Sequence, residues 1–208
     1  MNVLALFTCH AFAERQRSVY DTWFPAATAR GYRTEIFDGN RLGVRDDYES
    51  LPVKTQALFR WAVAEGVERL VKIDDDTYVN MARFEIPNVD YGGQLTPPSD
   101  DGSGRAGAGR APAGTHPFPY AGGGAYVVSR RAMEILARAP INDWAEDRWV
   151  GNTLARNGVQ LTPLPGWLFV NWGHRVDEYL HPSNVVIMQI PSVADLRRTH
   201  AWMANHAC

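Results

Sequence analysis

Residues 69–80 read RLVKIDDDTYVN, a strand-like apolar stretch that runs directly into three adjacent aspartates. A strand over 69–73 would place the carboxylates of residues 74–76 at its carboxyl end, where open α/β sheets bind their ligands. The apolar character resumes at Tyr78 and Val79, so the acidic cluster interrupts a core segment and does not decorate a surface loop. This stretch predicts an α/β fold with a ligand site at the edge of the sheet.

Working outward from this stretch, apolar runs alternate with segments of helical spacing. Further strands are expected over 3–8, 33–37, 125–128 and 185–190. Helices are expected over 12–24 (ended by Pro25), 51–65, 130–139, 146–157 and 193–203. The residues Asp38, Gly39 and Asn40 are expected to form a turn. This alternation favours an αβα sandwich with a mixed, mostly parallel central sheet.

The composition fits one domain spanning residues 1–208. The 208 residues are 45% hydrophobic, which is enough to bury a sizeable core. Residues 96–119 are rich in Gly, Pro and Ala, and we expect a flexible loop there. The two cysteines, Cys9 and Cys208, cannot form a disulfide framework, so a reducing, cytoplasmic location is expected.

The charge and hydropathy exclude some partner classes. The formal net charge is -2 and the sequence pI is about 6.3, which gives no general attraction for nucleic acid or an anionic membrane. No stretch approaches the roughly 20 apolar residues that span a bilayer, so no membrane span is expected.

Three adjacent carboxylates repel one another and need a compensating cation, solvent or a raised pKa. Side chains alternate along an extended segment, so Asp74 and Asp76 can face one side while Asp75 turns away to another partner. Their oxygen ligands suit Mg²⁺ or Mn²⁺. The alternative is an ordinary solvated acidic turn.

Five segments together resemble the β-1,3-galactosyltransferase and fringe family of glycosyltransferases. Residues 71–80 (VKIDDDTYVN) are similar to its KVDDDVFVN-like signature. The other four segments are the early Arg15, Arg17, Thr22 and Trp23, then 47–55 (DYESLPVKT), 119–129 (PYAGGGAYVVS) and 146–151 (EDRWVG). The resemblance covers most of the chain, in family order, and fades after Gly158.

This resemblance implies a single-domain GT-A fold and inverting transfer of a hexose or N-acetylhexosamine from a UDP-sugar to a hydroxyl acceptor, forming a β-1,3-type linkage. It implies Mn²⁺ (or Mg²⁺) as cofactor, bound by Asp74 and Asp76. The family's C-terminal histidine ligand is missing from 185–190, and His181 or His174 could replace it. Asp147 matches the family's catalytic base, although Glu146 and Asp147 could simply cap a helix.

Other residues are candidates for substrate contacts. The donor diphosphate would meet Asp74, Asp75 and Asp76 together with Arg15, Arg17 and Lys54, unless these basic residues are only solvated. The expected substrate lining consists of Tyr120, Gly122, Gly123, Gly124, Glu146 and Trp149. The glycine run permits a close approach to a ligand or an unusual backbone, or it forms an ordinary tight turn.

Two other functions remain open. A sugar nucleotidyltransferase would share the layered fold but would need a glycine-rich loop after the first strand, where this chain has 8–12 (TCHAF). A noncatalytic carbohydrate or nucleotide-sugar binding module would keep the metal site without turnover. The acceptor class is also open, and ranges from a glycan to a modified nucleobase in nucleic acid.

Overall fold

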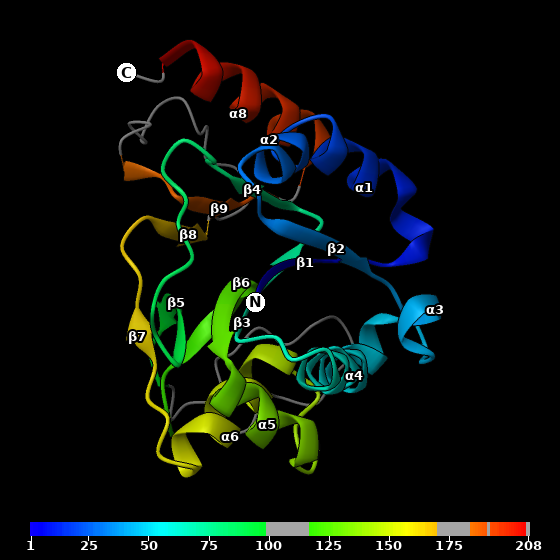
Figure 1. Cartoon of the computed structure of the whole chain (residues 1–208), viewed down its shortest axis with the longest axis vertical. Coiled ribbons are helices and arrows are strands. Elements are labelled where there is room, and N and C mark those ends of the chain that lie inside the picture. The colour runs from blue at the N-terminus through cyan, green and yellow to red at the C-terminus, as the bar shows by residue number, and fades with distance from the viewer. Residues whose placement is uncertain (99–116, 170–183, 191, 207–208) are drawn as a thin grey trace.

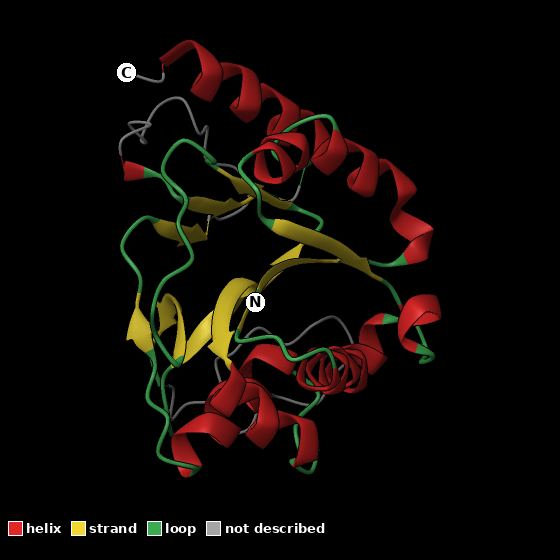
Figure 2. Ribbon diagram, in the orientation of Figure 1, coloured by secondary structure: helices red, strands yellow, loops and turns green. Residues whose placement is uncertain are grey.

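The structure, a computed structural model, describes residues 1–98, 117–169, 184–190 and 192–206. Its helices and strands form a layered α/β architecture (Figure 1; Figure 2). The expected loop 96–119 lies mostly outside the described residues, as do His174 and His181. None of the helices in the described ranges is long and apolar enough to cross a membrane.

A six-stranded sheet forms the centre of the fold, in the order β2-β1-β3-β6-β5-β7. Its strands are β1 (Asn2–Phe7), β2 (Arg33–Phe37), β3 (Arg69–Asp74), β5 (Tyr91–Thr96), β6 (Tyr120–Ser129) and β7 (Thr162–Pro163). The strands β2, β1 and β3 are parallel, and only β6 runs against its two neighbours. The predicted α/β sandwich with a mixed, mostly parallel sheet is confirmed.

A smaller sheet has the order β4-β9-β8. It contains β4 (Thr77–Val79), β8 (Trp167–Phe169) and β9 (Ile187–Gln189). Because β4 follows the aspartates directly and pairs antiparallel with β9, residue Thr77 stands opposite Gln189. The small sheet therefore brings a distant segment of the chain to the acidic cluster.

Helices cover both faces of the central sheet (Figure 1). On one face lie α4 (Leu51–Ala64), α5 (Arg130–Arg138) and α6 (Glu146–Arg156), with the short α3 (Gly39–Leu42) at the side. On the other lie α1 (Ala13–Tyr20), α2 (Phe24–Ala29) and α8 (Val193–His206). Two 3-10 turns, η1 (His10–Phe12) and η2 (Tyr48–Ser50), precede α1 and α4.

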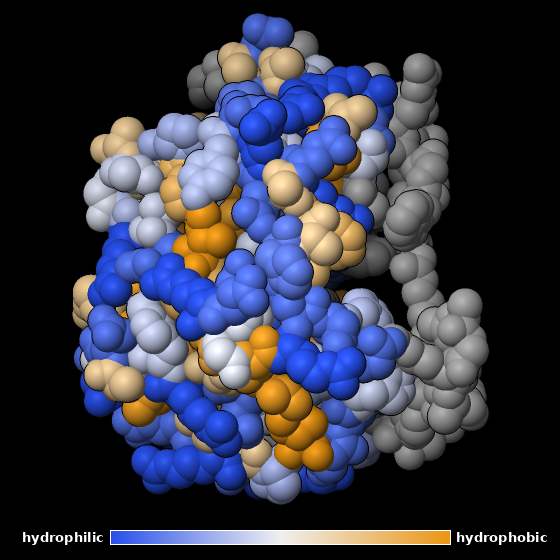
Figure 3. Space-filling view, turned by 90° about the vertical axis from the view of Figure 1, so that its right-hand side faces the viewer, coloured by the Kyte–Doolittle hydropathy of each residue, from blue (hydrophilic) through white to orange (hydrophobic). Residues whose placement is uncertain are grey.

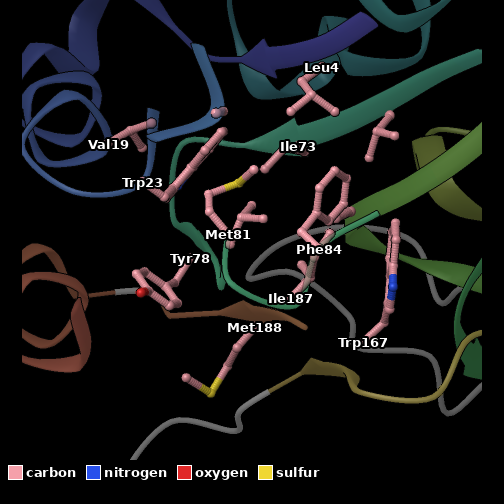
Figure 4. Close-up of a cluster of buried hydrophobic side chains, with 14 of the residues drawn as sticks. Leu4, Val19, Trp23, Ile73, Tyr78, Met81, Phe84, Trp167, Ile187 and Met188 are labelled. Atoms are coloured by element: carbon pink, nitrogen blue, oxygen red, sulfur yellow. The ribbon is translucent and has the colours of Figure 1, made fainter. Parts of the chain in front are cut away.

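The core consists of two clusters, one on each face of the sheet. Alternate residues of β1 divide between them, because Val3 and Ala5 join the cluster under α4–α6 while Leu4 and Leu6 join the opposite one. In the second cluster, Trp23 and Tyr78 pack with residues of the small sheet (Figure 4). The Trp23 indole also donates a hydrogen bond to the Thr77 carbonyl at 2.9 Å, which fixes the segment just after the aspartates.

The side of the molecule that Figure 3 draws is mostly polar. On the side drawn in Figure 3, hydrophilic residues predominate and hydrophobic ones form small separate patches. This distribution agrees with the amphipathic helices that the spacing predicts, whose apolar sides face the sheet.

Two local predictions were wrong, and for the glycine run the structure excludes the turn and the unusual backbone. Pro25 does not end one long helix but lies in the first turn of α2, where its missing N–H costs nothing. Residues 38–40 begin the helix α3, since Asp38 caps it by accepting from the Arg41 N–H at 2.8 Å. The glycines 122–124 lie inside the ten-residue strand β6, and none of them has a positive φ.

Candidate active site

The three aspartates lie where β3 ends and β4 begins, at the carboxyl edge of the parallel strands. Asp74 is in register with Phe7, the last residue of β1. The next residue after β1 is Thr8. This edge collects side chains from β1, β3 and the start of α1, as expected for a binding site in an open α/β sheet.

Asp75 is buried and turned toward the protein. Its carboxylate accepts a hydrogen bond from the Thr8 hydroxyl at 2.6 Å and lies 3.5 Å from the Arg15 guanidinium. Burial raises the pKa of the Asp75 carboxyl, against the opposing effects of Thr8 and Arg15. Asp75 is therefore placed to anchor the cluster and to hold Arg15 beside it.

Asp76 faces the small sheet. Both of its carboxylate oxygens accept from the Gln189 amide, at 3.1 and 3.3 Å, and the Arg15 guanidinium lies 3.9 Å away. Burial raises the pKa of the Asp76 carboxyl, the Gln189 hydrogen bond lowers it, and the charge of Asp75 raises it.

Asp74 pairs with a buried lysine that sequence reasoning missed. The Lys72 ammonium lies 2.6 Å from an Asp74 oxygen, and it also donates to the Gly123 carbonyl at 2.7 Å. Burial raises the pKa of the Asp74 carboxyl well above its ordinary value; Lys72 opposes this, and the charges of Asp76 and Glu146 add to it. A signal was present, because a lysine inside an apolar strand needs a buried partner.

Glu146 and Asp147 are the first two residues of α6, which packs against β6. Glu146 is buried, accepts a hydrogen bond from the Tyr126 hydroxyl, and lies 3.6 Å from Lys72. One carboxylate oxygen of Asp147 accepts a hydrogen bond from the Arg148 backbone N–H at 2.8 Å. Burial, followed by the charge of Glu146, raises the pKa of Asp147 to about 6.

The glycine run makes room for these side chains. A Cβ on Gly123 would lie 3.4 Å from an Asp147 oxygen, and one on Gly124 only 2.7 Å from the Gln189 amide oxygen. Gly123 therefore lies next to both the Asp147 carboxylate and the Lys72 ammonium, and Gly124 allows Gln189 to reach Asp76. The run serves close approach and not a turn.

The remaining predicted residues fall into two groups. Arg15 and the half-buried Tyr120 stay near the site, Arg15 through its aspartate contacts and Tyr120 at the start of β6, where burial and then Asp147 raise its pKa to about 12. Arg17 is exposed, and because it lies two positions after Arg15 along α1, it points to another side of the helix. Trp149 requires a correction: it is fully buried, donates to the Pro140 carbonyl, and belongs to the core, not to a substrate lining.

Lys54 supports the site through hydrogen bonds to other protein groups. It is 2% exposed, and its ammonium donates to the Thr8 carbonyl and to Asp46, both at 2.6 Å. Its described contacts are thus with protein groups, and it fixes the residue that holds Asp75. Asp46 also contacts His10 at 2.8 Å, and sequence reasoning missed this pair because no local pattern joins positions 36 residues apart.

Cys9, His10 and Asp46 bring possible metal ligands within 4.8 Å of one another. Lys54 already neutralises Asp46, however. Burial raises the pKa of the Asp46 carboxyl, but the hydrogen bonds from Lys54 and His10 outweigh burial and hold it well below its ordinary value. This group is therefore a salt-bridged support of the loop after β1.

Comparisons with known proteins agree with this geometry. A family model described as galactosyltransferase matches residues 38–87, which include the aspartate cluster. A glycosyltransferase "involved in the glycosylation of the major capsid of PBCV-1" has a similar crystal structure, with a TM-score of 0.57 and 15% identity over 96% of this chain and 99% of that one. The chain is thus a glycosyltransferase that resembles galactosyltransferases over residues 38–87.

The structural likeness shows the fold, which is the GT-A type that the resemblance implied. A search of curated proteins with the sequence gives no match. The predicted class of enzyme, a glycosyltransferase, is confirmed, and neither comparison supports a nucleic acid acceptor.

Proposed function

We propose that this glycosyltransferase moves a hexose or N-acetylhexosamine from a UDP-sugar to a hydroxyl group of a glycan, with inversion and with the help of a divalent cation. The supporting observation is the position of Lys72. Its buried ammonium lies between Asp74 and Glu146. It thereby links the carboxylates that would serve the donor to the start of α6, which carries Asp147.

The described residues fit a divalent cation. Burial raises the pKa of both Asp74 and Asp76 because it disfavours their ionised forms, and a bound cation would offset that penalty. The Gln189 amide oxygen is buried and has no hydrogen-bond partner among the residues that the structure describes. Because rotation of the amide exchanges its nitrogen and oxygen, Gln189 can offer an oxygen to a cation held by Asp76. Oxygen ligands of this kind suit Mg²⁺ or Mn²⁺.

Such a cation would supply Lewis-acid stabilisation of the diphosphate leaving group. The protein's own groups would position the donor. Arg15, 33% exposed beside Asp75 and Asp76, is placed to meet diphosphate oxygens from the side of α1.

Asp147 is the proposed base. Inversion by direct displacement requires a group that takes the proton from the attacking hydroxyl. The Asp147 carboxylate has one oxygen bound to a backbone N–H, while the other faces Gly123, which has no side chain to cover it. With a pKa of about 6, it is mostly ionised at neutral pH and still basic enough to accept a proton. The β-1,3-type linkage rests on the family resemblance alone.

Calorimetric titration tests the donor site. UDP, UDP-galactose, UDP-N-acetylglucosamine and UDP-glucose would each be added with Mn²⁺, with Mg²⁺ and without metal. We expect metal-dependent binding that Asp76→Asn abolishes. The matched control is Asp21→Asn, which removes an exposed carboxylate paired with Arg197 and should leave binding unchanged. A folded protein that binds no nucleotide in any condition would overturn the proposal.

Release of UDP from the donor in the presence of acceptor separates an enzyme from a noncatalytic binding module. The Asp147→Asn variant should bind the donor as the wild type does but release UDP slower by a factor of about 10²–10⁴. Normal release by this variant would remove Asp147 from the base role.

A further inference from the structure

A hollow lies away from the aspartates, between α5 and α6. It is an open groove of about 550 Å³, within the size range of small-ligand sites. Its lining residues are Arg131, Glu134, Ile135, Arg138, Ala139, Pro140, Asn142, Thr153, Arg156 and Asn157. The residues from α5 are spaced three and four apart, so they share one face of the helix.

The groove carries positive charge that the protein does not neutralise. Arg131 lies 3.5 Å from Asp90, and Glu134 pairs with Arg130 at 3.1 Å. Arg138 and Arg156 are both exposed, and neither has a carboxylate partner in the described parts of the chain. Two guanidinium groups are thus available to a ligand.

Arginines in the last turn of a helix often donate hydrogen bonds to its free carbonyl groups. At the ends of α5 and α6, other groups donate to these carbonyls. At the end of α5, Gln56 donates to the carbonyls of Leu136 and Ala139, at 3.1 and 2.7 Å. Arg60 donates to the Ala137 carbonyl at 3.0 Å. At the end of α6, the Leu154 carbonyl accepts from the Val159 N–H at 2.9 Å.

The other lining groups indicate the kind of anion. Asn142, Thr153 and Asn157 can exchange hydrogen bonds with hydroxyl groups, while Ile135 and Pro140 offer apolar contact. Guanidinium groups bind carboxylates in a bidentate manner. A chain of sugars bearing carboxylates combines hydroxyl groups, apolar C–H faces and negative charge.

The groove is distinct from the candidate active site. Arg156 follows Asp147 by nine residues along α6, which corresponds to about 13 Å of helix. We propose that the α5–α6 groove is a second binding site, one that takes a carboxylated saccharide chain. It rests on the groove's own residues and does not require the proposed donor, cation or base.

The test uses the full chain in metal-free buffer, with hexagalacturonate as the probe and a neutral galactose hexamer as its uncharged counterpart. We expect hexagalacturonate to bind, to bind more weakly as salt is raised, and to lose at least about tenfold in affinity in the double variant Arg138→Gln/Arg156→Gln. The neutral hexamer should bind at least about tenfold more weakly than hexagalacturonate to the wild type.

The control variant is Arg83→Gln, which removes an exposed arginine outside the groove and should bind hexagalacturonate as the wild type does. Equal affinity in the double variant would overturn the proposal, and so would equal binding of a polyphosphate of the same charge, which would indicate attraction without saccharide recognition. UDP titration of the same variants with Mn²⁺ reports on the donor site independently, so failure of either proposal is recognised separately.

Discussion

The Lys72 ammonium lies 2.6 Å from the carboxylate of Asp74, and the lysine side chain is only 1% exposed. Burial lowers the pKa of Lys72, but the charges of Asp74 and then Glu146 outweigh burial and raise it above its ordinary value. The lysine is therefore held as a cation inside the protein, where it offsets the acidic groups of the site.

Replacing Lys72 with methionine should strongly destabilise the protein. The substitution leaves Asp74 and Glu146 buried together without their shared cation, and loss of one partner of a buried ion pair costs about 3–5 kcal/mol. The free energy of unfolding from urea titration measures this loss. Arg198→Met, which breaks an exposed pair with Asp195, should cost less than about 1 kcal/mol. A loss at Lys72 as small as that of the control would contradict the assigned role.

The sequence predicted the positions of the acidic residues along the chain better than the contacts between them. The apolar run into residues 74–76 located the aspartates at the end of β3, and the spacing after Pro140 located Asp147 at the start of α6. These are local patterns that strand and helix periods determine. The link through Lys72 depends on β3 pairing with β6, and the pairing joins residues more than 50 positions apart.

The same reason explains the errors. Trp149 fits a helical pattern equally well on the core side or the ligand side, and only the packing of α6 on the sheet buries it. The sequence did not predict Gln189 as a partner of Asp76. The register of β4 with β9 brings Gln189 to Asp76, and no local pattern reveals that register.

Activity should rise with pH through a midpoint of about 6. Asp147 can accept a proton only when it is ionised, and burial raises its pKa to about 6. The rate of UDP release at saturating donor and metal, measured between about pH 4.5 and 8, checks this prediction. A flat profile across this range, with the protein folded throughout, would count against Asp147 as the base.

The same raised pKa predicts an opposite effect on stability. A carboxyl whose pKa is higher in the folded state than its ordinary value of 3.8 binds its proton more tightly when folded, so its contribution is favourable below pH 3.8 and is lost as pH rises through about 6. Asp147→Asn should therefore stabilise the protein by about 2 kcal/mol at pH 8 and by little near pH 4. Urea unfolding at the two pH values measures the difference, and an equal change at both would refute the linkage.

Gln189→Leu should weaken binding of Mn²⁺ about 10–100-fold, because it removes the amide that contacts Asp76 while keeping a similar volume. Electron paramagnetic resonance of free Mn²⁺ measures the affinity without requiring turnover. Gln160→Leu, at an exposed position before β7, is the control and should bind Mn²⁺ normally. If the Gln189→Leu variant bound Mn²⁺ with unchanged affinity, Gln189 would have no role in the proposed cation site.

The two glycines Gly122 and Gly124 offer a matched pair for testing why β6 carries a glycine run. A Cβ on Gly124 would lie 2.7 Å from the Gln189 amide oxygen, whereas one on Gly122 would have no neighbour closer than 3.8 Å. Gly124→Ala should therefore push Gln189 away from Asp76, destabilise the fold by about 1–3 kcal/mol and weaken Mn²⁺ binding as Gln189→Leu does. Gly122→Ala should leave both quantities close to those of the wild type, because its backbone has no positive φ and its methyl group makes only ordinary van der Waals contacts. Equal effects of the two substitutions would mean that the run serves strand geometry and not the approach of Gln189 to the aspartates.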